Sequence, residues 1–253
     1  MNNAPVRTVS DAKRDFYSLH TRPINSIYRR VVDELLVEMH LLSVNGDFVY
    51  DPIYALGIVT TFDRFMEGYE PEADKASIFN ALCRAIKGSP EQYRSDAEAM
   101  TAAVAGLSLN EFKAQFDNLN EAAHSGGLRG TLGAVASREK FKYSRPFGIG
   151  LYTLLEGVVE EETLKNKEAF EALLQDLTGK LNFPAEKLSK DLELYRSNLE
   201  KFAQAQEVMR DLLVAERKKR EERQQAAEIL PAGTTEPVTT PAGEPAESND
   251  SDS

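Results

Sequence analysis

The chain has 253 residues and a formal net charge of −11, from 41 acidic and 30 basic side chains. A field of this sign repels nucleic acid, so binding to DNA or RNA is not expected. The only cysteine, Cys83, excludes an internal disulfide framework and is typical of a reducing compartment. No run of about 20 apolar residues is present, and the sequence therefore predicts no membrane-spanning helix.

Helix start and stop signals follow one another through the first half of the chain. They predict a short helix from Ser10 and further helices over residues 23–42, 51–68, 71–87 and 89–106. Asp51 followed by Pro52 is typical of a helix cap and a first helical position. Ser108 and Glu111 form a capping-box pattern that predicts another helix.

A glycine-rich segment separates these helices from the second half of the chain. This segment lacks the preceding strand and the lysine-serine/threonine ending of a phosphate-binding loop. It is therefore predicted to be a flexible connector, and its glycines are Gly126, Gly127, Gly130 and Gly133. Helices are predicted over residues 143–159 and 161–178. No persuasive strand signal is found, so the fold class is all-α.

One long helix is predicted near the C-terminus. Residues 185–229 contain no proline or glycine, and a helix of that length spans roughly 65–70 Å. Apolar residues recur at gaps of four and three, typical of a coiled coil, at Leu188, Leu192, Tyr195, Leu199, Phe202, Met209 and Leu213. Bulky aromatic residues in the seam fit a narrow parallel dimer poorly. We expect the first half to pack on the protein's own body and the charged second half to remain free.

Three regions follow from these patterns. Residues 1–183 are predicted to form a helical, bundle-like body, and residues 184–230 the long C-terminal helix. Residues 231–253 carry four prolines, five acidic side chains and no basic one. Such a segment cannot bury enough apolar surface to order itself, so it is predicted to be a disordered tail.

No pattern of residues indicates catalysis. Glu121 and His124 have the Glu-x-x-His spacing of a metal pair, but the motif occurs once and lacks the two further glutamates of a di-iron bundle. Cys83 lies on an apolar helical face without a nearby base, and is interpreted as a core residue. The acidic run 160–162 is interpreted as the charged first turn of a helix. We therefore predict no catalytic, cofactor or metal site, and a protein that is not an enzyme.

Two basic segments stand out against the acidic background. The first interleaves cations with Phe141, Tyr143 and Phe147, and consists of Arg129, Arg138, Lys140, Lys142 and Arg145. The second lies on the long helix and consists of Arg217, Lys218, Lys219 and Arg220. Both are candidates for contact with a partner protein or an anionic membrane surface. The alternative is that the aromatic side chains belong to the core and the cations are merely solvated.

Four long runs resemble one protein family. They are TVSDAKRDFYSLHTRPINSIYRRVVDELLVEMHLL (8–42), DPIYALGIVTTFDRFMEGY (51–69), FKYSRPFGIGLYTLLE (141–156) and KDLELYRSNLEKF (190–202). The chain is similar over roughly residues 7–215 to the thylakoid formation proteins, also called photosystem II biogenesis proteins.

The resemblance implies a non-enzymatic helical factor of oxygenic phototrophs, working in thylakoid biogenesis and in photosystem II assembly and repair. It also implies a partner, the membrane-bound AAA protease of the FtsH type, and it offers no catalytic residues. The similarity begins near Met1 and leaves no room for a transit peptide, and no signal peptide is found. This predicts a cyanobacterial protein in the cytoplasm and, peripherally, on the cytoplasmic side of the thylakoid membrane. A helical module that binds pigment or lipid at the thylakoid surface is the alternative.

Overall fold

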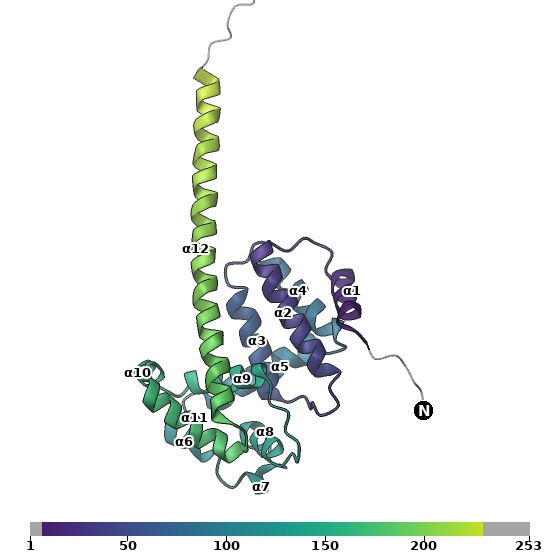
Figure 1. The fold of residues 1–253 in the computed structure, drawn as a ribbon, viewed down its shortest axis with the longest axis vertical. Helices are drawn as coiled ribbons and strands as arrows, with labels where there is room; N and C mark the ends of the chain where they lie inside the picture. Colours follow the sequence, from purple (N-terminus) through teal and green to yellow (C-terminus); the bar gives the residue numbers. More distant parts are fainter. Residues whose placement is uncertain (1–6, 230–253) are drawn as a thin grey trace, which may run out of the picture. The chain divides into compact units, whose positions relative to one another are not determined.

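The computed structural model of the protein describes residues 7–229, and the side chains of residues 7–224. Within those residues the chain forms twelve α-helices and no strand (Figure 1). The predicted all-α fold with a long C-terminal helix is therefore confirmed. The chain has two compact units, of which the first ends at Ala203 and the second begins at Gln204. The predicted tail, residues 231–253, lies outside the described residues.

The helices follow one another with short connections. The first six are α1 (Val9–Leu19), α2 (Ser26–Ser43), α3 (Pro52–Phe65), α4 (Ala73–Ala85), α5 (Pro90–Val104) and α6 (Leu109–Ala114). The others are α7 (Leu119–Ala122), α8 (Gly127–Ala136), α9 (Arg145–Glu156), α10 (Glu161–Lys165), α11 (Lys167–Leu181) and α12 (Ala185–Ile229).

Side-chain caps begin several helices where the sequence predicts them. The Asp51 carboxylate accepts a hydrogen bond from the Tyr54 N–H at 2.9 Å, and Pro52 opens α3. The capping box of Ser108 and Glu111 opens α6. One predicted helix is wrong: residues 161–178 form two helices, α10 and α11. The side chain of Asn166 accepts from the Ala169 N–H at 3.1 Å, which caps a new helix inside the predicted one.

Helix α3 lies at the centre of the core, with buried residues on almost every side and α9 and α5 as its main neighbours. Two glycines bring the backbones of α3 and α9 into direct contact. A Cβ atom added at Gly57 would lie 1.7 Å from the carbonyl oxygen of Pro146. One added at Gly150 would lie 1.9 Å from the carbonyl oxygen of Ile53. Real Cβ atoms do not approach this closely, so this crossing requires glycine at both positions.

The glycine-rich segment is not the flexible connector that was predicted. From Gly127 it forms helix α8, which buries Leu128, Leu132 and Val135. Gly133 faces α7, where an added Cβ would lie 2.6 Å from the Ala123 nitrogen. Close approach to a neighbouring helix thus outweighs the low helix propensity of glycine.

The first half of α12 packs into the core of the first unit, as predicted. Leu188, Leu192 and Tyr195 are buried there. The ring of Phe202 meets those of Tyr28 and Phe65 with 5.4 Å between centroids in each case. The contact with Tyr28 joins the beginning of α2 to a late position in the packed part of α12.

Candidate functional site

The two candidates that the sequence offered for chemistry, Cys83 and the Glu121–His124 pair, do not form a site in the described residues. Cys83 is buried, and burial raises the pKa of its thiol to about 12, so the thiol stays protonated at neutral pH. Glu121 lies in the four-residue helix α7, and His124 follows the end of that helix. No group of three or more His, Cys, Asp or Glu side chains in the described residues is arranged to hold a metal ion.

The arginines of the basic segment 129–145 are tied to the fold. Arg138 donates to the carbonyl oxygen of Val49 at 3.2 Å and to the Asp51 carboxylate at 3.3 Å. Arg145 pairs with Glu38 at 3.3 Å. Arg129 donates to the carbonyl oxygen of Ala114 at 3.2 Å. These three cations therefore connect segments of the chain that are far apart in sequence.

Arg138 has a structural role, because it pairs with the buried carboxylate of Asp51. The aspartate is only 4% exposed. Burial raises the pKa of its carboxyl group above the ordinary value, while the Tyr54 N–H and the Arg138 guanidinium oppose that shift. The arginine is the nearby positive charge that opposes the effect of burial and favours the ionised form of this carboxylate.

Replacing Arg138 with methionine is expected to lower the free energy of unfolding by about 2–4 kcal/mol near pH 8, because the Asp51 carboxylate stays buried without its counter-charge. The loss should shrink as the pH falls to about 4. Because the folded-state pKa of Asp51 is raised, folding favours the protonated carboxyl group. The stability that this protonation adds is present at low pH and is lost as the pH rises through the folded-state pKa. Urea denaturation of both proteins at the two pH values measures the difference.

The double variant with Arg138→Met and Asp51→Asn provides the control. Asparagine retains the helix cap but carries no charge, so much of the lost stability should return near pH 8. A loss of stability that is the same at both pH values would contradict the assigned ion pair.

The two lysines of the segment behave differently from its arginines. Lys140 and Lys142 are exposed, and no carboxylate among the described side chains pairs with either. The structure adds Lys187, whose Nζ atom lies 4.9 Å from the centroid of the Tyr143 ring. The sequence did not single out Lys187, because 44 positions separate it from Tyr143.

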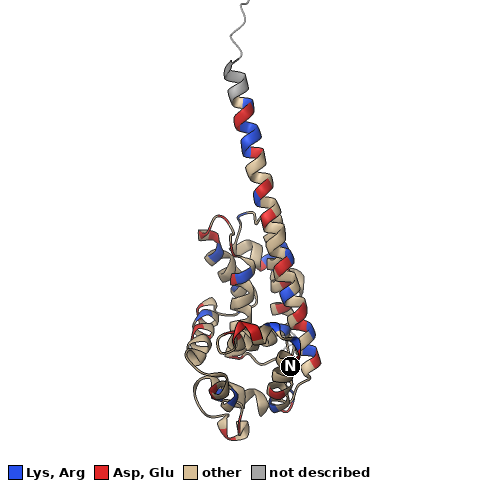
Figure 2. Cartoon of the chain, turned by 90° about the vertical axis from the view of Figure 1, so that its left-hand side faces the viewer, with Lys and Arg blue, Asp and Glu red and all other residues tan. Residues whose placement is uncertain are grey.

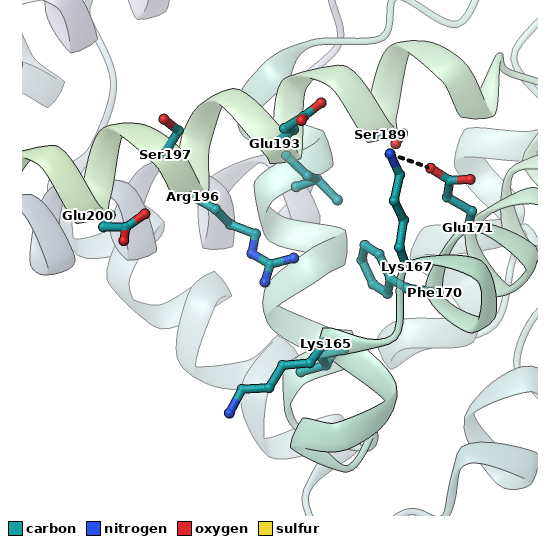
Figure 3. Close-up of a pocket in the computed structure, with 11 residues that line it drawn as sticks. Lys165, Lys167, Phe170, Glu171, Ser189, Glu193, Arg196, Ser197 and Glu200 are labelled. Carbon is teal, nitrogen blue, oxygen red and sulfur yellow. Dashed lines mark ion pairs between the residues drawn. The ribbon is translucent and has the colours of Figure 1, made fainter.

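A groove of about 430 Å³ lies between α10, α11 and the packed half of α12. Phe170 and Leu192 form part of its lining, and Arg196 extends from α12 toward α10 (Figure 3). Lys167 and Glu171 pair across 3.9 Å at its edge. Three basic and three acidic side chains line this groove, namely Lys165, Lys167, Arg196, Glu171, Glu193 and Glu200. Because the charges balance, the groove selects no ligand by its charge.

The second half of α12 carries an exposed apolar cluster, which consists of Val208, Leu212, Leu213 and Val214. These side chains are 59–63% exposed. They are four of the ten large apolar side chains that are strongly exposed in the described part of the chain. Their concentration within seven positions is typical of a binding surface rather than of scattered surface residues.

The basic run Arg217–Arg220 follows directly on the same helix and is exposed (Figure 2). Lys219 lies seven positions after Leu212, and Arg220 seven after Leu213, so each of these cations lies on the same side of the helix as one of the two leucines. No ion pair among the described side chains engages the run, and its charges are available to a partner. We call the apolar cluster and the basic run together the α12 stripe.

Comparison with known proteins identifies the family. The family model described as thylakoid formation protein matches residues 8–224. The chain belongs to this family. It is 57% identical over 222 residues to Protein Thf1 of Trichormus variabilis, covering 88% of this chain and 95% of that relative. Protein Thf1 of Acaryochloris marina is 49% identical over 247 residues, covering 97% of this chain and 98% of that relative.

A solved structure of Psb29 shares the fold. It superposes with a TM-score of 0.74 at 44% identity, covering 85% of this chain and 99% of that chain. The resemblance noted from the sequence is therefore confirmed, and the protein's role lies in thylakoid formation and photosystem II biogenesis. Thylakoid formation proteins are not a known enzyme family. None of the helices described for this member combines the length and the apolarity needed to cross a bilayer.

Proposed function

We propose that this thylakoid formation protein is a non-enzymatic auxiliary factor that binds an FtsH-type membrane AAA protease complex and maintains it during photosystem II assembly and repair. It acts peripherally, on the cytoplasmic side of the thylakoid membrane. The α12 stripe is the surface that contacts the protease.

The exposed apolar cluster is the observation that carries this proposal. Four aliphatic side chains gather on one short stretch of helix, although their exposure to water is unfavourable. Completing the burial of each contributes about 1–2 kcal/mol. A helix laid into an apolar groove of a partner is a common recognition mode, and it would bury the members of this cluster that face the groove.

The basic run adds a requirement on the partner. Lys219 and Arg220 follow Leu212 and Leu213 toward the C-terminal end of the helix, each on the side of one leucine, so the complementary groove should be acidic at one end. Charges of this kind act mainly on the rate of association and on the choice of partner. Because the protein is strongly acidic overall, a local basic surface steers an acidic partner toward the stripe.

Maintenance of the protease follows from linkage. A protein that binds the assembled complex but not its separate subunits shifts the population toward the assembled form. No covalent chemistry is needed for this shift of population.

Deletion of the gene, followed by measurement of protease abundance and of photosystem II recovery after bright light, tests the proposed function. Both should fall in the deletion strain, and the full-length chain should restore both. Affinity capture from solubilised thylakoids should recover the protease with the tagged full-length chain. Unchanged abundance and unchanged recovery would rule out this function.

A further inference from the structure

One end of the first unit brings together three segments that are distant in sequence. They are the end of α2 with the loop that follows it, the loop between α8 and α9, and the first turn of α12 (Figure 1). Two contacts hold them side by side. Arg138 donates to the carbonyl oxygen of Val49 at 3.2 Å, and the Nζ atom of Lys187 lies 4.9 Å from the Tyr143 ring centroid.

Exposed aliphatic side chains gather at this end. Leu41 is 55% exposed, Val44 is 42% exposed and Val49 is 53% exposed. They lie within nine positions at the end of α2 and in the loop after it. The rest of residues 7–203 exposes only three further large apolar side chains this strongly, namely Tyr17, Leu19 and Leu194.

Lysines without ion pairs gather at the same end. Seven of the twelve lysines in residues 7–203 pair with a carboxylate. Lys140, Lys142 and Lys187 are three of the five that do not. All three are exposed. Three lysines without an ion pair in one place are available to an anionic partner, although Lys187 also lines a groove that contains Asp33, Glu34, Glu38 and Asp191.

Ring contacts and ion pairs hold the backbone near these lysines in place. The rings of Phe141 and Phe147 lie 4.9 Å apart, and those of Tyr143 and Phe183 lie 5.2 Å apart. The ion pairs of Arg138 and Arg145 fix both ends of the same loop. A partner therefore meets cations whose backbone is already ordered, which reduces the entropy cost of binding.

We propose that this surface, formed by Leu41, Val44, Val49, Lys140, Lys142 and Lys187, docks the protein on an anionic lipid bilayer. We call it the lysine face. The lysines contact lipid phosphates, and each strengthens the attraction to an anionic surface. The three aliphatic side chains enter the boundary between headgroups and acyl chains.

A lipid surface explains both the aliphatic side chains and the lysines of the lysine face. The aliphatic side chains are flanked by cations from two other segments, the combination typical of interfacial anchors. Asp47 and Glu139 are also exposed on these loops, and they oppose binding to anionic lipid. Removing the Glu139 charge should therefore strengthen vesicle binding, the opposite of the effect of removing a lysine. The four carboxylates that share a groove with Leu41 and Lys187 each have a partner in the fold, which reduces their opposition; they are Asp33, Glu34, Glu38 and Asp191.

Co-sedimentation of the full-length protein with vesicles tests this proposal. The vesicles contain either phosphatidylcholine alone or phosphatidylcholine with about one-third phosphatidylglycerol. The protein should bind the anionic vesicles and not the neutral ones, and less so as salt is added. Lys140→Gln, Lys142→Gln and Lys187→Gln together should reduce the partition coefficient by about tenfold to a hundredfold.

Three further variants separate the lysine face from general charge effects. Arg29→Gln, Lys87→Gln and Lys201→Gln remove three exposed cations outside the lysine face that also lack an ion pair, and should leave partitioning nearly unchanged. Leu41→Gln with Val49→Gln should weaken binding without changing the net charge. Glu139→Gln should strengthen it.

Three outcomes would overturn the proposal. They are no binding to the anionic vesicles, an equal loss of binding in the two triple variants, and unchanged vesicle binding of the lysine variant accompanied by loss of an acidic protein partner. The last result would assign the lysine face to protein docking. Vesicle binding and protease capture are separate measurements, so either proposal can fail without the other.

Discussion

Replacing Gly57 with alanine is expected to destabilise the first unit strongly. The new methyl carbon would lie 1.7 Å from the Pro146 carbonyl oxygen, a backbone atom that no side-chain rotation can move. Helices α3 and α9 would have to separate across the centre of the core. We expect a loss of about 3 kcal/mol or more in the free energy of unfolding. This corresponds to a fall in Tm of about 6–12 °C, measured by circular dichroism.

Gly179 offers a matched control for this substitution. It lies in the last turns of α11, is exposed, and an added Cβ would meet nothing within 4 Å. Gly179→Ala should stabilise the protein by about 0.5–1 kcal/mol, because alanine loses less backbone entropy than glycine on forming a helix. If Gly57→Ala were as stable as Gly179→Ala, the contact between the backbones of α3 and α9 would be disproved.

Polar substitution in the α12 stripe is expected to have the largest effect on the proposed protease contact. Leu212→Gln with Leu213→Gln removes the two leucines of the apolar cluster, which are each 61% exposed. We expect binding of the captured protease complex to weaken by about thirtyfold, or about 2 kcal/mol. Folding should not change, because substitutions at exposed positions usually shift stability by less than about 0.5 kcal/mol.

Two leucines of the first unit provide the matched control. Leu19 and Leu194 are each 48% exposed, and Leu19→Gln with Leu194→Gln should leave capture of the protease unchanged. Lys219→Gln with Arg220→Gln should weaken capture chiefly at low salt, where the charges are least screened. Equal capture by the stripe and control variants would show that the protease, if bound, uses another surface.

Helix boundaries set by neighbouring residues could be predicted from the sequence. The cap of α3 joins Asp51 to the N–H three positions later, and the capping box of α6 joins Ser108 to Glu111. Both patterns are complete within four residues, so they form wherever those residues occur. The helical pattern of Leu188, Leu192 and Tyr195 likewise predicted the buried side of α12.

Two boundaries could not be predicted in this way. Asn166 caps a new helix inside residues 161–178, although the surrounding residues have the composition of one continuous helix. The glycines of α8 favour a loop by propensity. They form a helix because Gly133 allows the backbone of α7 to approach. The free energy of packing against a distant segment exceeds the local preference in such cases.

The candidate surfaces also combine features that the sequence sets locally with features that depend on distant contacts. The sequence by itself determined the all-helical fold, the long C-terminal helix and the basic content of residues 129–145 and 217–220, because composition and periodicity are local properties. Only the tertiary structure decided which cations remain available. It paired Arg138 with Asp51 and Arg145 with Glu38, across 87 and 107 positions, and it brought Lys187 to Tyr143. A charge is neutralised by whatever lies within about 4 Å of it in space, and distance along the chain does not reveal that neighbour.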